Sequence, residues 1–193
     1  MHTANRNTLR TASWIAAALL LLASVSALAQ EGSGRETYQA TAMGQGTQMG
    51  RLYSVNIIIE SYSTPEERQS LIEAFNKGGN EAIVDVLTHL PSRGRIAITG
   101  TLGYEIKFAR VFPTATGRKI RIVTDRPLHF GELRRGDRST DYSLSVLELD
   151  ISNVKGQSGG VLLPACQFKI SKEGELELEA YQNPWKLTNF LDR

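Results

Sequence analysis

Apolar positions along the chain follow a strand-like segment, then a helical stretch, and then a long succession of strand-like segments. The first segment, residues 52–62, alternates apolar side chains on one face and places Ile58 and Tyr62 on the other. Alternation over such a length predicts a strand, and apolar residues on both faces predict that it is covered on both sides. We therefore expect this strand near the middle of a sheet.

The helical stretch begins at Thr64-Pro65-Glu66-Glu67. Thr64 suits the cap of a helix, Pro65 its first turn, and Glu67 the reciprocal position of a capping box. One face then carries Arg68, Leu71, Ile72 and Phe75, and Gly78-Gly79 ends the period. Asn80 is expected to cap a second helix, which buries Ile83, Val86, Leu87 and Leu90 and stops at Pro91. This predicts a helical hairpin over residues 65–90 that packs on a sheet.

The remainder of the chain alternates in the manner of strands joined by short connections. The expected strands are residues 95–99, 104–112, 119–125, 142–151, 161–171, 175–181 and 185–191. Short connections make neighbouring strands antiparallel. The class is therefore α+β and β-rich: an antiparallel β-sandwich or partly closed barrel, formed by a single domain over residues 51–193, with the helical hairpin packed on it.

Two local features predict strand register. A turn at Lys172-Glu173-Gly174 sets Ile170 opposite Leu176, Phe168 opposite Leu178, and Lys169 opposite Glu177. Along residues 142–151 the apolar positions change from even to odd numbers, which predicts a bulge near Val146.

The N-terminal region divides into two parts. Residues 1–29 carry Arg6 and Arg10, then an apolar run from Trp14 to Ala23, then an Ala-x-Ala site ending at Ala29. This is typical of a secretory signal peptide cleaved before Gln30, and the apolar run is too short to span a bilayer. Residues 30–50 are rich in Gly, Gln, Thr and Ser, so we expect a flexible leader with at most one short strand around residues 37–42.

Three segments carry a resemblance to other proteins: Tyr62-Ser63-Thr64-Pro65-Glu66-Glu67-Arg68, Thr124-Asp125-Arg126-Pro127 and Glu177-Leu178-Glu179-Ala180-Tyr181. Over residues 52–190 the chain resembles a group of secreted bacterial proteins of unassigned function. The resemblance implies an exported, mostly β domain, in a bacterial periplasm or secreted. It brings no catalytic residue, cofactor or ligand.

Charge and cysteine content exclude several partners. The 22 Lys and Arg include Arg6 and Arg10, so the basic residues left after cleavage equal the 20 Asp and Glu in number. A neutral mature chain lacks the positive field on which nucleic-acid binding depends. Cys166 is the one cysteine, so neither an intramolecular disulfide nor a lipid-modified cysteine at the cleavage site is expected. We expect no transmembrane segment after cleavage.

Candidate catalytic residues each have a structural alternative that the sequence favours. Gly156-Gln157-Ser158-Gly159-Gly160 matches a nucleophile pattern, and His89 with Asp125 or Asp150 completes a nominal triad. The segment lies between two strands, where Gly and Ser are typical of a turn. Cys166 alternates with Phe168 and Ile170, so we expect a buried, unreactive thiol. The spacing of His89 and His129 fits no metal site, and no cofactor fingerprint occurs.

The candidate binding residues are arginines. The long connection at residues 126–141 contains Arg126, His129, Arg134, Arg135 and Arg138, which together suit a carboxylate or phosphate; the alternative is a solvated loop with internal ion pairs. Arg110 shares the even phase of its apolar neighbours, so either a bulge turns it outward, or it enters a cavity, or it forms a structural ion pair.

Three functions follow from these residues. The leading hypothesis is an exported, non-catalytic binding or envelope-associated protein that uses the Arg-rich loop. The alternative is a carrier of a small apolar or amphiphilic ligand inside a barrel, with Arg110 at the head group. A serine hydrolase using Ser158 is the remote alternative.

Overall fold

The computed structural model describes residues 34–99, 102–128, 143–170, 176–181 and 183–192. Within these residues the chain forms ten strands, one 3-10 helix and one long helix. The strands are β1 Glu36–Gly44, β2 Leu52–Ile59, β3 Gly94–Ile98, β4 Tyr104–Ile106, β5 Phe108–Thr114, β6 Gly117–Thr124, β7 Leu144–Ser152, β8 Gly159–Ile170, β9 Leu176–Ala180 and β10 Trp185–Asp192. The 3-10 helix is η1 Gly46–Gln48, and the long helix is α1 Pro65–His89.

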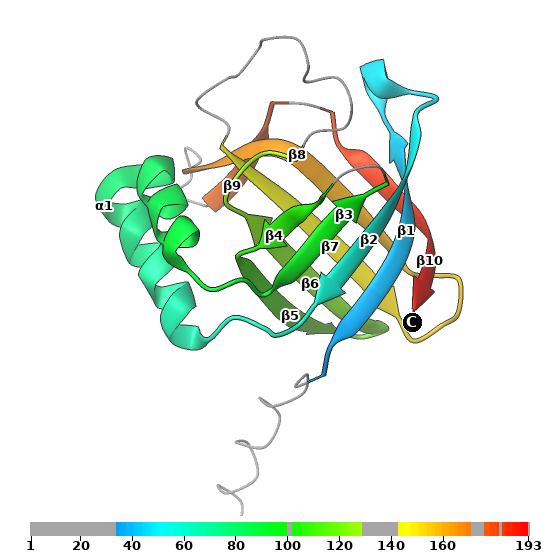
Figure 1. The fold of residues 1–193 in the computed structure, drawn as a ribbon, viewed down its shortest axis with the longest axis horizontal. Coiled ribbons are helices and arrows are strands. Elements are labelled where there is room, and N and C mark those ends of the chain that lie inside the picture. The colour runs from blue at the N-terminus through cyan, green and yellow to red at the C-terminus, as the bar shows by residue number, and fades with distance from the viewer. Residues whose placement is uncertain (1–33, 100–101, 129–142, 171–175, 182, 193) are drawn as a thin grey trace, which may run out of the picture. The chain divides into compact units, whose positions relative to one another are not determined.

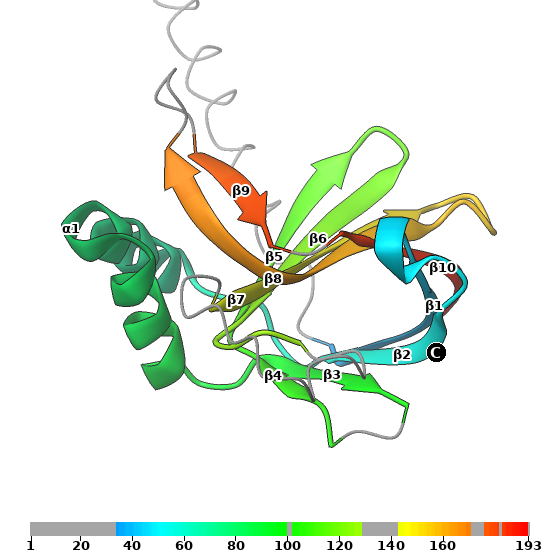
Figure 2. The same ribbon diagram turned by 90° about the horizontal axis from the view of Figure 1, so that it is seen from above.

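All of these strands belong to one antiparallel sheet. Its order is β4-β3-β2-β1-β10-β8-β7-β6-β5, and β9 pairs with β8 outside this path. The sheet curls until β4, at one end of the order, contacts β6 near the other end (Figure 1). Seen from above, α1 lies on one side of the curled sheet (Figure 2). The predicted class is confirmed: an antiparallel sheet nearly closed into a barrel, with a helix packed on it.

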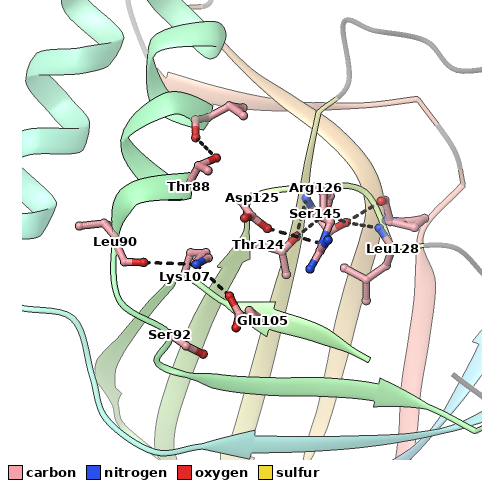
Figure 3. A network of polar contacts seen from close by, with 12 residues as sticks. Thr88, Leu90, Ser92, Glu105, Lys107, Thr124, Asp125, Arg126, Leu128 and Ser145 are labelled. Atoms are coloured by element: carbon pink, nitrogen blue, oxygen red, sulfur yellow. Dashed lines mark hydrogen bonds and ion pairs between the residues drawn. The ribbon is translucent and has the colours of Figure 1, made fainter. Parts of the chain in front are cut away.

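The barrel closes at Lys107, where the sequence predicts one uninterrupted strand over residues 104–112. That prediction is wrong, because β4 pairs with β3 while β5 pairs with β6, and Lys107 is the corner between them. Its backbone N–H donates to the Val123 carbonyl at 3.0 Å. Its Nζ donates to the Leu90 carbonyl at 3.3 Å and pairs with Glu105 at 2.9 Å (Figure 3). This largely buried ammonium is therefore paired and hydrogen-bonded, as burial requires.

The corner changes which side chains face the interior. Ile106 on β4 and Ala109 on β5 both belong to the core inside the barrel, although one position is even and the other odd. Phe108 instead joins a second cluster, under α1. Arg110 therefore lies on the outer face of the sheet. This is the outward orientation that the sequence offered as one alternative, although a corner at Lys107 causes it rather than a bulge.

The apolar side chains form two clusters. The larger fills the inside of the curled sheet and includes Tyr38, Ile57, Leu149 and Trp185. The smaller lies between α1 and the outer face of the sheet and includes Ile83, Leu87, Phe108, Val123, Leu144, Val146 and Cys166. Because the sheet has an apolar inner face and a partly apolar outer face, α1 covers surface that would otherwise meet water.

Strand β1 lies in the segment predicted to be a flexible leader, and that prediction is wrong for residues 36–44. The strand pairs with β2 on one side and with β10 on the other, in the middle of the sheet. Tyr38, Ala40 and Ala42 alternate inward and are buried. Their alternation matches the short strand expected at residues 37–42. The composition of the segment did not predict an ordered strand in the middle of the sheet, because two of its three buried side chains are small alanines.

Helix α1 begins as predicted and bends where the first helix was expected to end. The Glu67 N–H donates to Thr64 Oγ1 at 3.2 Å, and the Thr64 N–H donates to Glu67 Oε2 at 3.0 Å, so the capping box is confirmed. Gly78 and Gly79 have non-helical backbone angles, with φ of 63° at Gly79, and they separate two helical segments. The left-handed φ is one that glycine adopts without steric cost.

The predicted capping role of Asn80 is wrong. Its amide Nδ2 donates to the Phe168 carbonyl at 2.6 Å, and its Oδ1 accepts the Phe168 N–H at 2.7 Å. Pairing of β7 with β8 extends only to Leu144 and Cys166, which leaves these backbone groups of β8 without a strand partner on that side. Asn80 occupies this place, and it fixes the bend of α1 to the sheet.

The predicted register of the β8–β9 hairpin is confirmed. Phe168 pairs with Leu178, Lys169 with Glu177, and Ile170 with Leu176. The bulge predicted near Val146 is also present, as a register shift between Leu144 and Val146. The extra residue lies on β8 beside Pro164, which has no N–H for the ladder. This bulge does not cause the change of apolar phase on β7, as the sequence suggested, because β7 carries no extra residue. Leu144 and Val146 pack under α1 whereas Leu149 packs inside, so the two faces of β7 are covered by different apolar clusters.

Buried hydroxyl groups hold the strand ends that flank the connection from residue 129 to residue 142. The Leu128 N–H donates to Ser145 Oγ at 2.7 Å, and Ser145 Oγ donates to the Pro164 carbonyl at 2.6 Å (Figure 3). Thr124 Oγ1 donates to the Arg126 carbonyl at 2.6 Å. The Leu128 N–H also donates to the Pro164 carbonyl at 2.9 Å, so the Ser145 hydroxyl reinforces a direct backbone bond beside the bulge.

Candidate functional site

A cleft of about 380 Å³ lies between α1 and the outer face of the sheet. Its apolar lining is Leu71, Ile72, Phe75, Ile83, Leu87, Phe108, Phe112, Val123 and Phe168. Its polar lining is Arg68, Asn76, Arg110 and Arg121. The volume is near the lower end of the range for small-molecule sites, and an apolar lining with a few polar groups is typical of them.

The helical wall of the cleft comes from the face that the sequence identifies. Arg68, Leu71, Ile72 and Phe75 lie three or four residues apart on the first segment of α1, and Ile83 and Leu87 follow on the second. The Phe75 ring meets the Phe168 ring edge to face, with centroids 6.4 Å apart. Because the Asn80 amide holds Phe168 by its backbone, the bend in α1 and this aromatic contact are fixed together.

On the sheet wall, Phe112 contacts two arginines. The Arg110 guanidinium lies 4.7 Å from the ring centroid of Phe112, and the Arg121 guanidinium lies 5.5 Å from it. Both arrangements are cation–π contacts, which hold a guanidinium at a defined place on an apolar surface. Arg110 on β5 and Arg121 on β6 are directly paired across the two strands.

The two arginines differ in their acidic partners. Arg121 Nε donates to Glu148 Oε1 at 2.7 Å, and Lys119 Nζ lies 3.3 Å from Glu148 Oε2. Burial would raise the pKa of Glu148, but the hydrogen bonds and charges of Arg121 and Lys119 outweigh burial and lower it. Among the described residues, Arg110 and Arg68 have no carboxylate within ion-pair distance.

The predicted arginine site is only partly described. The exposed Arg126 lies with its guanidinium 5.9 Å from the ring centroid of Tyr104 and pairs with Asp125 at 3.8 Å. It does not line the cleft, so the structure does not bring it together with Arg110. His129, Arg134, Arg135 and Arg138 lie outside the described residues, and their role in anion binding stays a prediction.

The nominal triad is not assembled. His89 is exposed at the end of α1, where its ring contacts the Asp85 carbonyl at 2.7 Å. Ser158 lies between β7 and β8, where its Oγ accepts the Ser152 N–H at 3.1 Å. Helix α1 and the β7–β8 connection lie on opposite sides of the sheet in both ribbon views (Figures 1 and 2). Ser158 therefore acts as a turn residue, as its context predicts.

Cys166 is buried in the cluster beneath α1, as predicted. Burial raises the pKa of its thiol to about 12, and a hydrogen bond to the backbone only partly opposes this. Such a thiol is protonated and unreactive at neutral pH. Within the described residues no group of three or more His, Cys, Asp or Glu side chains is placed to hold a metal ion. In the same part of the chain, no helix has an apolar stretch long enough to cross a bilayer.

The sequence predicted components of the cleft separately, but it did not predict the site. The apolar phase of Arg110 and the shared helical face of Arg68 were both visible in the sequence. Nothing in the sequence indicated that Arg68 and Arg110 line the same cleft, because α1 and β5 are brought together only when the sheet folds. The fold and site thus define a nearly closed antiparallel barrel with an external cleft beneath its helix. No family model, curated protein or solved structure matches the chain.

Proposed function

We propose that this protein is an exported, non-catalytic binding protein that carries a small amphiphilic ligand in the cleft between α1 and the sheet. The observation that supports this proposal best is the mixed lining of the cleft, which combines aromatic and aliphatic walls with arginines that lack acidic partners. Apolar walls suit the tail of an amphiphile, and a few charged groups suit its head.

The location differs from the one expected for a carrier. The sequence suggested a ligand inside the barrel, but large side chains such as Tyr38 and Trp185 pack there into a continuous core. Arg110, the expected head-group residue, lies on the outer face and lines the external cleft. The ligand therefore lies beneath α1, with Arg110 still at its head group.

An apolar fluorescent dye in solution tests the cleft. Ile72 is 40% exposed and lines the cleft, so Ile72→Lys is expected to fold and to weaken dye binding at least about tenfold by placing a charge against the tail. Leu52 is 61% exposed and does not line the cleft, so Leu52→Lys is the control and should bind as the wild type does. Equal binding by all three proteins would count against the cleft as the ligand site.

Export is tested separately. We expect the mature protein, recovered from outside the cytoplasm of its host, to begin at Gln30, because the site ending at Ala29 suits signal peptidase. Intact-mass measurement gives the N-terminus directly. A full-length chain confined to the cytoplasm would contradict export without affecting the cleft.

A further inference from the structure

Arg110 is held in place without a partner for its charge. Its guanidinium lies on the Phe112 ring at 4.7 Å, and the side chain is only partly exposed. Partly buried arginines elsewhere in the described residues each have a carboxylate: Arg93 has Glu67, Arg118 has Glu36, and Arg121 has Glu148. Because a partly desolvated cation is stabilised by an opposite charge, Arg110 is ready to accept an anion from outside the chain.

Arg68, an exposed residue, provides a second guanidinium from the opposite wall. It lines the cleft from α1, whereas Arg110 lines it from β5, and neither has a carboxylate partner among the described residues. Arg121 contributes little further attraction, since Glu148 already neutralises it. An anionic head group entering the cleft thus meets two available guanidinium groups.

The size and charge of the site restrict the ligand further. A volume of about 380 Å³ is near the lower end of the range for small-molecule sites, which favours a ligand with one alkyl chain. Of the two guanidinium groups that lack a carboxylate in the described part of the chain, Arg110 is partly buried and Arg68 is exposed, so one negative charge is enough to neutralise the partly buried cation. A singly charged carboxylate is therefore favoured over a doubly charged phosphate.

We infer that the ligand is a single-chain fatty acid whose carboxylate binds Arg110 and Arg68 while its chain lies between α1 and the sheet. This inference rests on the proposed carrier function and adds the chemistry of the head group. Arg110 and Arg68 then determine specificity for an acid, and the aromatic walls formed by Phe75, Phe112 and Phe168 accept the chain.

Binding of four twelve-carbon ligands to the mature protein tests this inference. Laurate is expected to bind at least about tenfold more tightly than 1-dodecanol, because a hydrogen bond to a charged group contributes about 1.5–3 kcal/mol. Dodecyl phosphate should bind more weakly than laurate, and dodecyltrimethylammonium most weakly. Arg110→Gln should reduce the affinity for laurate about tenfold or more and leave that for dodecanol unchanged. Arg95→Gln, at an exposed position outside the cleft, is the matched control.

The outcomes separate the two proposals. If none of the four ligands binds, the carrier function itself is wrong. If laurate and dodecanol bind equally well, or if Arg110→Gln weakens both equally, the cleft binds chains but the arginines do not select a carboxylate. Tighter binding of dodecyl phosphate than of laurate would overturn the assignment of a carboxylate.

Discussion

The side chain of Asn80 takes the place of a neighbouring strand at Phe168. Its amide donates one hydrogen bond to the Phe168 carbonyl at 2.6 Å and accepts one from the Phe168 N–H at 2.7 Å. This connection joins the bend of α1 to β8 beside the cleft. It also covers a short stretch of strand edge that β7 leaves unpaired.

Replacing Asn80 with Ala is expected to lower the free energy of unfolding by about 2–3 kcal/mol, because two bonds are lost and two partly buried backbone groups lose their partner. Urea unfolding with an unchanged m-value measures this. The control is Gln69→Ala, an exposed amide bonded to Glu73, for which a change within about 0.5 kcal/mol is expected. Similar losses in both variants would contradict the strand-replacing role.

Ser145 is expected to be the most sensitive serine among those whose bonds are described above. It is 1% exposed, and its Oγ joins the Leu128 N–H to the Pro164 carbonyl. Ser145→Ala should cost about 1–3 kcal/mol of unfolding free energy, because the remaining groups are buried beside the β8 bulge. Ser70→Ala removes an exposed hydroxyl bonded to the Glu66 carbonyl and should have little effect. The prediction fails if thermal unfolding cannot distinguish the two variants.

The ion pair of Glu36 with Arg118 joins β1 to β6 at one end of the barrel. Arg118 donates two hydrogen bonds, at 3.0 and 2.9 Å, to a carboxylate that also accepts the Tyr38 hydroxyl at 2.6 Å. Glu36→Gln should lower the unfolding free energy by about 1–3 kcal/mol, since a partly buried guanidinium loses its charge partner.

The matched control for Glu36 is Asp150→Asn. Asp150 is largely exposed and lies 3.7 Å from Lys119 Nζ, so its contribution should be within about 1 kcal/mol of zero. Calorimetry of both variants at the same pH provides the comparison. A larger effect from Asp150 than from Glu36 would show that burial does not decide the strength of these pairs.

Cys166 predicts a dependence of stability on alkaline pH. Burial raises the pKa of the thiol in the folded protein from its ordinary value of 9.0 to about 12. Between these values the unfolded chain releases the proton and the folded chain keeps it, so the thiol's contribution to stability is present below pH 9 and is lost as pH rises toward 12. The stability advantage of the wild type over Cys166→Ala should therefore shrink by about 2 kcal/mol between pH 8.5 and pH 10.5.

Thiol labelling gives an independent measurement on the wild type. At pH 8 a disulfide reagent should react with Cys166 slowly in the native protein and rapidly in urea, because only the unfolded chain presents an accessible thiolate. Rapid native labelling would mean that the thiol is neither buried nor protonated.

Features set by neighbouring residues were predictable from the sequence. The capping box at Thr64 and the register of the β8–β9 hairpin depend on residues a few positions apart, and both are confirmed. The hydrogen-bond partner of Asn80, Phe168, lies 88 residues away in the chain. The sequence favoured a local cap instead, because Asn is a preferred residue at the start of a helix. The local prediction was wrong because the unpaired backbone of Phe168 at the strand edge binds the Asn80 amide instead.

The cleft was unpredictable for a related reason. Whether Arg110 faces inward or outward depends on the corner at Lys107, and nothing in the alternation of residues 104–112 marks that corner. At Lys107 the chain turns from pairing with β3 to pairing with β6, which closes the barrel. Barrel closure depends on all of the strands together and leaves no local sequence pattern. The arginine was thus recognisable as unusual, while its surroundings required the structure.

The corner at Lys107 has a consequence for how the barrel forms and how it avoids association. The two ends of the sheet order, β4 and β5, are separated in the chain by a single residue. Because the chain itself holds these ends together, the loop-closure entropy is lost instead where β1 pairs with β10, as in the pairing of Tyr38 with Asp192. Neither end offers a long free edge to the strands of another molecule, because β4 has three residues, while on β5 the backbone of Ala109 bonds to Ser63 and Pro113 has no N–H to donate.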